Sequence, residues 1–145
     1  MNDSFYFLDN NVVSHLSKSQ LASSFFTERC RIPSEVFHEA GKRDAIRGAV
    51  YPTTVEVLDA LSDVMATIDP ADTTLVDLYA NKGNADPMLV ACALLETRRT
   101  TELLVKPEWF VVSNDAAVRT KAAHVGVNSL TREAFFSRTA RSWND

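Results

Sequence analysis

Short apolar runs alternate with longer stretches of helical periodicity along the chain. Four runs are too short for helices and rich in aromatic or β-branched residues, which predicts strands at residues 4–9, 30–33, 109–115 and 127–130. Apolar residues recurring every three or four positions predict helices near 10–17, 34–42, 54–66, 70–83, 87–98 and 116–126, and from 131 onward. Because helical segments separate the strands, the connections must cross over the sheet. The pattern therefore predicts an α/β fold, a three-layer α/β/α sandwich with a mostly parallel central sheet.

Capping residues mark the expected ends of several helices. Asn10 or Asn11 is a suitable N-cap for the first expected helix, and Thr53 with Glu56 forms a capping box for the third. Asp-Pro pairs open the fourth and fifth helices, and Gly126 is the expected residue just past the end of the sixth. The fifth helix is apolar on nearly all sides, so we expect it in the centre of the protein.

Composition and charge are those of an ordinary globular protein. The chain has 145 residues, 46% of them hydrophobic, and a formal net charge of −4, so we expect one folded domain and no disordered bulk. No apolar run approaches the roughly 18 residues of a membrane span, and the N-terminal segment lacks the basic region of a signal peptide. We therefore expect a cytoplasmic protein without a membrane partner. Cys30 and Cys92 match no metal or redox spacing, and we expect buried, reduced thiols.

Acidic residues occupy the positions at which α/β proteins bind ligands. Asp9 and Asp115 each end a predicted strand, and ligands of parallel sheets gather beyond the carboxyl ends of the strands. Asp86 opens the apolar helix, and Glu35 and Glu39 lie four residues apart on one helix face. Converging carboxylates repel one another and are costly to bury unpaired, so such a cluster is expected to bind Mg²⁺ or Mn²⁺. Each aspartate alone is equally well explained as a helix N-cap.

Four sequence blocks together resemble the PIN domain. The blocks are FLDNN, IPSEVFHE, GNADPMLVACAL and VVSNDAAVRTKAAHVGV, and the resemblance covers roughly residues 5–130. The nearest subgroup is similar in length: the small PIN-domain ribonuclease toxins of bacterial toxin–antitoxin pairs, the VapC-like proteins. The resemblance implies a single PIN-like domain over residues 1–145 that acts as a metal-dependent endoribonuclease. It also implies an RNA substrate, a small antitoxin protein as partner and a homodimer.

The same resemblance assigns roles to individual acids. It places the first metal-binding aspartate on Asp9, with Asn11 supporting the site by hydrogen bonding. The pattern of a proline, a valine and then a glutamate selects Glu39, with Glu35 as the alternative. The third acid falls on Asp86, at the start of the long central helix.

The fourth acid falls on Asp115, with Ser113 as a supporting residue where the family frequently has threonine. The implied mechanism is metal-assisted hydrolysis with one or two ions, in which a bound water attacks the phosphodiester. The three aspartates hold the ion or ions, and Glu39 completes the shell directly or through water. Basic residues next to two of the acids are candidates for RNA phosphate contacts, with ordinary surface solvation as the alternative: Lys42, Arg43, Arg47, Arg119 and Lys121.

Other protein classes fit the sequence less well. A receiver-like signalling domain needs adjacent acids near the first strand and a lysine after a late strand, but here Asp9 is followed by Asn10 and Asn11. A phosphatase of the haloacid dehalogenase type needs Asp-x-Asp, and no glycine-rich phosphate loop is present. A PIN-like module that binds RNA without cutting it remains an alternative, although such a module is expected to have lost an acid.

Overall fold

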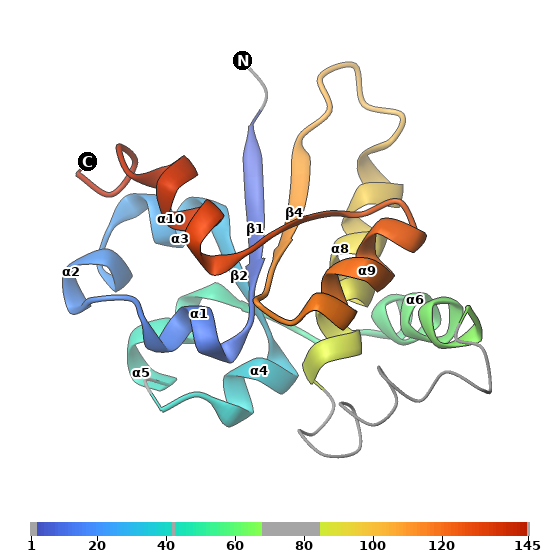
Figure 1. Ribbon diagram of the computed structural model, residues 1–145, viewed down its shortest axis with the longest axis horizontal. Helices are drawn as coiled ribbons and strands as arrows, with labels where there is room; N and C mark the ends of the chain where they lie inside the picture. The colour runs from blue at the N-terminus through green and yellow to red at the C-terminus, as the bar shows by residue number, and fades with distance from the viewer. Residues whose placement is uncertain (1–2, 42, 68–84, 145) are drawn as a thin grey trace.

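The computed structural model describes residues 3–41, 43–67 and 85–144, and within them one five-stranded sheet (Figure 1). The strands are β1 (Ser4–Leu8), β2 (Cys30–Pro33), β3 (Val50–Tyr51), β4 (Glu108–Val112) and β5 (Asn128–Leu130). They lie in the order β3-β2-β1-β4-β5, and every pair of neighbours is parallel. The crossover connections expected from the sequence are therefore confirmed.

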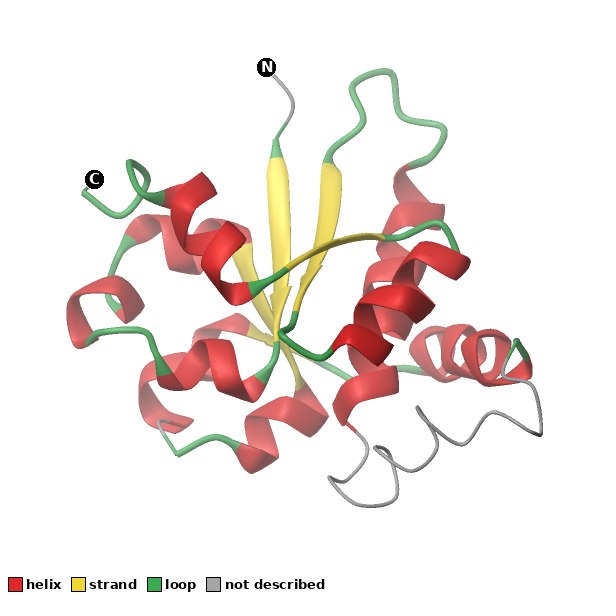
Figure 2. Cartoon of the chain, in the orientation of Figure 1, coloured by secondary structure: helices red, strands yellow, loops and turns green. Residues whose placement is uncertain are grey.

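Helices cover both faces of this sheet (Figure 2). They are α1 (Asn10–Ser14), α2 (Lys18–Leu21), α3 (Ser24–Arg29), α4 (Ser34–Glu39), α5 (Arg43–Ile46), a 3-10 turn (Arg47–Ala49), α6 (Val55–Ala66), α8 (Ala85–Thr100), α9 (Ala116–His124) and α10 (Arg132–Thr139). Figure 1 shows α6, α8 and α9 on one side of the sheet and α1, α2, α3 and α10 on the other. This arrangement confirms the three-layer α/β/α sandwich.

The apolar helix α8 lies at the centre of the protein, as expected. It contacts β1, β2 and β4 with one part of its surface and α6 and α9 with others. Residues 88–94 are all buried, because no side of this helix faces water along that stretch.

The N-cap of the first helix lies one residue before the two caps expected from the sequence. The N-cap of α1 is Asp9, whose Oδ1 accepts the Val12 N–H at 3.0 Å, so the expectation of Asn10 or Asn11 as cap was wrong. Strand β1 ends at Leu8, so Asp9 is the residue between the strand and the helix. Its short carboxylate side chain is well suited to cap the helix. An acid expected at the end of a strand is therefore also the start of a helix.

The cap of α6 is shifted by one residue from the expected capping box. Thr54, not Thr53, caps the helix, and its Oγ1 accepts the Val57 N–H at 3.2 Å. The Thr53 hydroxyl instead hydrogen-bonds to the Ser34 hydroxyl at 2.6 Å. Gly126 has φ of 81° just past the end of α9, which confirms its expected place in the left-handed conformation.

Several boundaries differ from the sequence prediction. The two-residue strand β3 is too short to leave an alternation pattern and was not expected. The helix expected at 34–42 ends at Glu39, because Ala40 is extended with ψ of 145°. The helix expected at 70–83 lies outside the described residues. No helix in the described ranges is long and apolar enough to cross a membrane.

Candidate functional site

Asp9 and Asp115 lie at the carboxyl ends of the two central strands. Strands β1 and β4 pair with Leu8 opposite Val112, and the Asp9 N–H donates to the Val112 carbonyl at 3.3 Å. Asp115 caps α9, and its Oδ1 accepts the Ala117 N–H at 2.9 Å. The two side chains are near enough for the charge of Asp115 to raise the pKa of Asp9. The fold thus brings together two of the four acids selected from the sequence.

The surroundings of Asp9 disfavour its charged form. Burial is the largest effect and raises the pKa of Asp9 above its ordinary value, and repulsion from Asp115 raises it further. Hydrogen bonds from the Val12 backbone, the Ser113 side chain and the Asn11 backbone lower the pKa without cancelling the effect of burial. An ionised Asp9 therefore costs free energy in the folded protein, and a cation bound beside it would offset that cost.

Ser113 connects the two aspartates. This residue is fully buried between β4 and the start of α9, and its N–H donates to the Leu130 carbonyl at 3.0 Å. Its Oγ accepts the Asp115 N–H at 3.1 Å, and its side chain lowers the pKa of Asp9. The supporting role expected for Ser113 stays a prediction.

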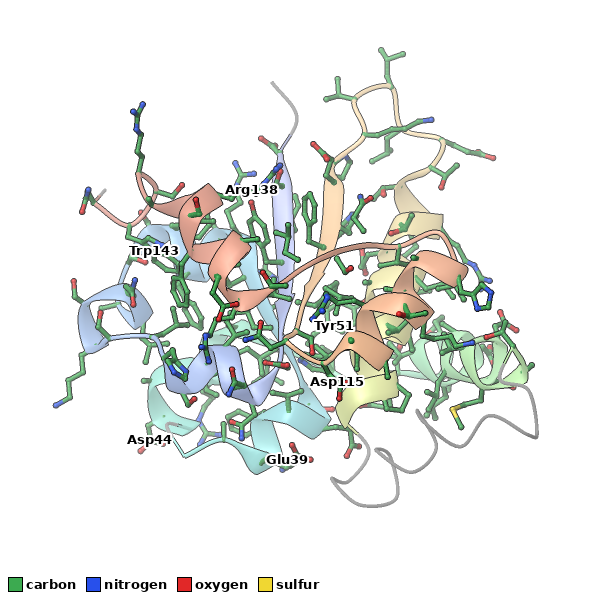
Figure 3. The ribbon with its side chains drawn as sticks, in the orientation of Figure 1. Glu39, Asp44, Tyr51, Asp115, Arg138 and Trp143 are labelled. Atoms are coloured by element: carbon green, nitrogen blue, oxygen red, sulfur yellow. The ribbon has the colours of Figure 1, made fainter. Side chains whose placement is uncertain are left out.

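Helix α4 carries both candidate glutamates. It follows β2 directly and contacts both α1 and α8, the helices that begin at or near Asp9 and Asp86. Glu35 is half-buried in the first turn of α4, and Glu39 is exposed at its last residue. Figure 3 shows Glu39 and Asp115 on the same side of the molecule, below the carboxyl ends of the strands. Helix α4 therefore lies between the two helices that carry Asp9 and Asp86 at their starts, and a role for Glu39 or Glu35 stays a prediction.

Asp86 lies in the first turn of α8, but its side chain lies outside the described part of the structure. Among the side chains that are described, no three of the His, Cys, Asp and Glu type come close enough to hold a metal ion together. Asp9 and Asp115 nevertheless bring carboxylate oxygens and excess negative charge to one edge of the sheet. Such a set fits Mg²⁺ or Mn²⁺ and does not fit zinc.

Two of the basic residues expected to contact RNA make hydrogen bonds within the protein. Lys121 is only 7% exposed, and its ammonium donates to the carbonyl and hydroxyl of Thr67 at 3.3 and 3.1 Å. This lysine therefore ties α9 to the end of α6, and its burial leaves little room for a phosphate. Arg119 donates to the Ser113 carbonyl at 2.9 Å, so it braces the segment between the two aspartates.

The remaining basic candidates lie around α5. Arg47 is exposed, pairs with Asp44 at 3.4 Å and lies over the Phe37 ring at 5.5 Å. Arg43 is the first residue of α5, and its side chain is not among those described. Lys42 lies outside the described residues. A phosphate contact by these residues stays a prediction.

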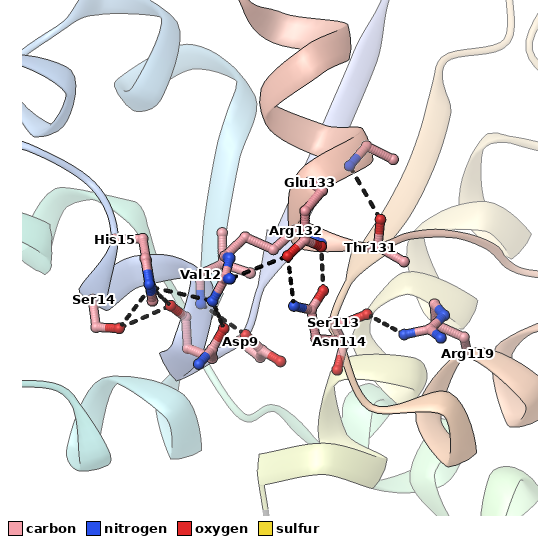
Figure 4. Close-up of polar contacts among 12 residues, drawn as sticks. Asp9, Val12, Ser14, His15, Ser113, Asn114, Arg119, Thr131, Arg132 and Glu133 are labelled. Atoms are coloured by element: carbon pink, nitrogen blue, oxygen red, sulfur yellow. Dashed lines mark hydrogen bonds and ion pairs between the residues drawn. The ribbon is translucent and has the colours of Figure 1, made fainter.

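The structure adds a polar network that sequence reasoning missed (Figure 4). Arg132, the first residue of α10, donates through Nη1 to Asn11 Oδ1 at 2.7 Å and through Nη2 to Glu133 Oε1 at 3.1 Å. Asn114 donates to the same Glu133 oxygen at 3.3 Å and accepts the Arg132 backbone N–H at 2.6 Å. Asn11 thus uses its side chain to hold Arg132, while its backbone supports Asp9. Because 121 positions separate Asn11 from Arg132, only the fold could have paired them.

No protein-family model matches this chain, and no curated protein matches it.

Proposed function

We propose that this protein is a metal-dependent endoribonuclease of the PIN type, which hydrolyses phosphodiester bonds in RNA with Mg²⁺ or Mn²⁺. One observation carries the proposal. Asp9 and Asp115 lie at the carboxyl ends of adjacent parallel strands, and the buried Ser113 accepts the Asp115 N–H and lowers the pKa of Asp9. Carboxylates gathered at this edge of a parallel α/β sheet are typical of a divalent-cation site. The resemblance of four sequence blocks to the PIN domain supports the same assignment.

The residues of the chain would share the work of holding the cation and the substrate. Asp9 and Asp115 would bind the ion together with Asp86, and Glu39 would complete the set directly or through water. The cap bonds to Val12 and Ala117 fix the direction of the two described aspartates. When bound, the cation stabilises charge on the phosphoryl oxygens and makes a water nucleophilic at neutral pH.

The proposal includes a cellular role that rests on the PIN resemblance. The protein would be the toxin of a toxin–antitoxin pair, with a small antitoxin protein covering the acidic site and a homodimer as its working form. A monomeric mass in solution scattering would contradict the dimer. A genome without a small open reading frame beside the one for this chain would contradict the paired antitoxin.

The test of the enzymatic activity is cleavage of natural RNA. The purified chain is incubated with total bacterial RNA in Mg²⁺ or in Mn²⁺, and the new ends are mapped by sequencing. Parallel reactions contain EDTA, the Asp9→Asn variant or the Asp63→Asn variant. Asp63 is the matched control, because it is an exposed acid on α6 that pairs with Arg98 at 2.7 Å.

Discrete cuts are expected with the wild type and with Asp63→Asn, and they are expected to vanish with EDTA and with Asp9→Asn. Asparagine keeps the Oδ1 that caps α1, so a lost activity cannot be blamed on a lost cap. No cuts with either metal, from a folded protein that still binds single-stranded RNA, would favour a non-catalytic RNA-binding module. No cuts and no RNA binding would overturn the proposal altogether.

A further inference from the structure

Arg132 is held in a fixed position beside the acid pair. Its guanidinium bonds Asn11 on one side and Glu133 on the other, and its side chain is 24% exposed (Figure 4). Asn11 is two residues from Asp9, in the first turn of the helix α1 that the Asp9 carboxylate caps. Arg132 therefore reaches, from the far end of the chain, the same turn that positions Asp9. A guanidinium has five N–H donors, and two of them make these bonds.

The helix that carries Arg132 is anchored independently of this network. Phe135 of α10 is fully buried against the aromatic ring of Tyr6, with the ring centroids 5.0 Å apart. Arg138 of the same helix donates to the Tyr6 hydroxyl at 3.2 Å. The backbone position of Arg132 is therefore fixed by core packing of α10 and by its N–H bond to Asn114, and the contacts of its guanidinium set the direction of the side chain.

His15 lies beside Arg132 on this surface. Its Nδ1 lies 2.8 Å from the Asn11 carbonyl and 3.5 Å from Arg132 Nη1, and the residue is exposed. A ring that donates from Nδ1 to a backbone carbonyl has its other nitrogen on the opposite side of the ring. His15 and Arg132 thus lie together next to Asp9, where a polyanion bound over the acids would pass.

The composition of the cluster argues against a purely structural cross-link. Arg132 is paired with an exposed carboxylate, Glu133, whose side chain is 64% exposed, and such surface pairs contribute little to stability. Of the basic residues near the acids, Lys121 is buried and Arg119 is turned to the Ser113 carbonyl. Arg132 is a partly exposed guanidinium that is tied through Asn11 to the helix that Asp9 caps.

We propose that Arg132, oriented by Asn11 and flanked by His15, binds a backbone phosphate of single-stranded RNA next to the bond that is cut. The inference rests on the proposed function, because it takes the acid pair as the place of cleavage. The planar guanidinium forms paired hydrogen bonds to two phosphate oxygens, which a lysine cannot reproduce. Glu133 competes with the phosphate for the same guanidinium and so limits the affinity.

The test measures RNA binding in a background that does not cleave. In Asp9→Asn protein with Mg²⁺, binding of a labelled single-stranded RNA is followed by fluorescence anisotropy between about 50 and 200 mM KCl. Arg132→Gln is compared with Arg98→Gln, which removes the same charge from the exposed Arg98–Asp63 pair. Glu133→Gln is compared with Glu102→Gln, an exposed acid in the loop before β4. Arg132→Lys keeps the charge and changes the geometry, and thermal unfolding of each variant reports its folding.

Arg132→Gln is expected to bind RNA about tenfold more weakly than Arg98→Gln. Its slope of log affinity against log salt is expected to fall by about 0.7, the value for one lost phosphate contact on a single strand. Arg132→Lys is expected to keep the slope and lose part of the affinity. The Glu133→Gln variant is expected to bind the RNA more tightly than the Glu102→Gln variant. If the Arg132–Glu133 pair were only structural, the two variants would bind the RNA equally well.

Equal affinity and equal salt slope for Arg132→Gln and Arg98→Gln would overturn the phosphate subsite. If that result comes from a chain that cuts RNA, only the subsite fails and the proposed nuclease activity stands. If the unmodified chain neither cuts nor binds single-stranded RNA, the proposed function fails and the subsite fails with it.

Discussion

The carboxylates of Asp9 and Asp115 face the same edge of the sheet, and the charge of Asp115 raises the pKa of Asp9. Parallel pairing of β1 with β4 makes this closeness unavoidable, because the two strands end side by side at Leu8 and Val112. Burial of Asp9 adds a larger effect in the same direction. The fold therefore disfavours the charged form of Asp9, and burial contributes more to this than Asp115 does.

The first prediction is that Asp9→Asn stabilises the protein at neutral pH when EDTA removes divalent cations. The pKa of Asp9 is raised in the folded state, so its favourable contribution exists below its ordinary pKa of about 3.9 and is lost as pH rises through the folded value. Asparagine stays neutral and keeps the helix cap. Urea unfolding at pH 7 should show a higher midpoint for the variant, and the difference should shrink as the pH falls toward 4.

Asp63→Asn serves as the control for this comparison, because Asp63 pairs with Arg98 on an exposed surface. It should leave the midpoint nearly unchanged or lower it slightly. A wild type that is as stable as Asp9→Asn at pH 7 would show that Asp9 carries no electrostatic cost.

The second prediction concerns divalent cations. Millimolar Mg²⁺ or Mn²⁺ should raise the melting temperature of the wild type by roughly 9 °C, since a cation at about 100 times its Kd adds about 2.7 kcal/mol to stability. Asp9→Asn and Asp115→Asn should each lose most of this shift, and Asp63→Asn should keep it. The measurement is thermal unfolding at constant ionic strength. Equal shifts in all three variants would indicate general screening and no specific site.

Much of the fold was predictable because its signals are local. The strand Cys30–Pro33 was predicted with its observed bounds, since proline stops the ladder where the run of apolar residues ends. The all-round apolar pattern of α8 placed it correctly in the core. In contrast, β3 has only two residues, and its pairing of Ile32 with Val50 is a tertiary contact without a sequence pattern.

The site was predictable only in part, for the same reason. Asp9 and Asp115 follow strands, so strand prediction alone placed them at one edge of the sheet. Arg132 follows no strand, and nothing near it in the sequence marks Asn11 as its partner. The basic residues next to Asp115 along the chain include Lys121, which α9 turns inward toward Thr67. A basic residue that is close to an acid in sequence is therefore not always the basic residue whose side chain lies near that acid in the fold.

The third prediction separates two neighbouring threonines. Thr54→Ala removes the hydroxyl that accepts the Val57 N–H, so the free energy of unfolding should fall by about 1 kcal/mol. Thr53→Ala removes an exposed contact with the Ser34 hydroxyl and should cost less than about 0.5 kcal/mol. Urea denaturation of both variants measures the difference. The reverse order of costs would mean that the helix begins one residue earlier, at the capping box expected from the sequence.

The fourth prediction concerns Ser113, which links the two aspartates. Ser113→Ala leaves the Asp115 N–H without its acceptor in a buried place and should cost about 1–3 kcal/mol of stability. It should also raise the pKa of Asp9 further, because the Ser113 hydrogen bond lowers that pKa in the wild type. Carboxyl chemical shifts followed through an acid titration measure the change. An unchanged Asp9 titration would show that Ser113 supports Asp115 alone.

The last prediction concerns alkaline pH and a pair far from the acids in sequence, Tyr51 on β3 and Glu96 on α8. The Tyr51 hydroxyl donates to Glu96 Oε1, which also accepts from Arg99 at 3.1 Å. Burial is the largest cause that raises the pKa of Tyr51, and the hydrogen bond and charge of Glu96 raise it further. The folded protein therefore holds this proton more tightly than the unfolded chain does.

The stabilisation from Tyr51 is consequently complete below its ordinary pKa of about 10 and is lost as pH rises through the higher folded value. Tyr51→Phe should lower stability by about 1 kcal/mol near pH 8 and should remove part of the decline above pH 10. Glu96→Gln should bring the ionisation of Tyr51, followed by ultraviolet absorbance, to lower pH, because the charge of Glu96 is one of its causes. Parallel stability profiles for wild type and Tyr51→Phe across that range would mean that Tyr51 ionises equally readily in the folded and unfolded chain.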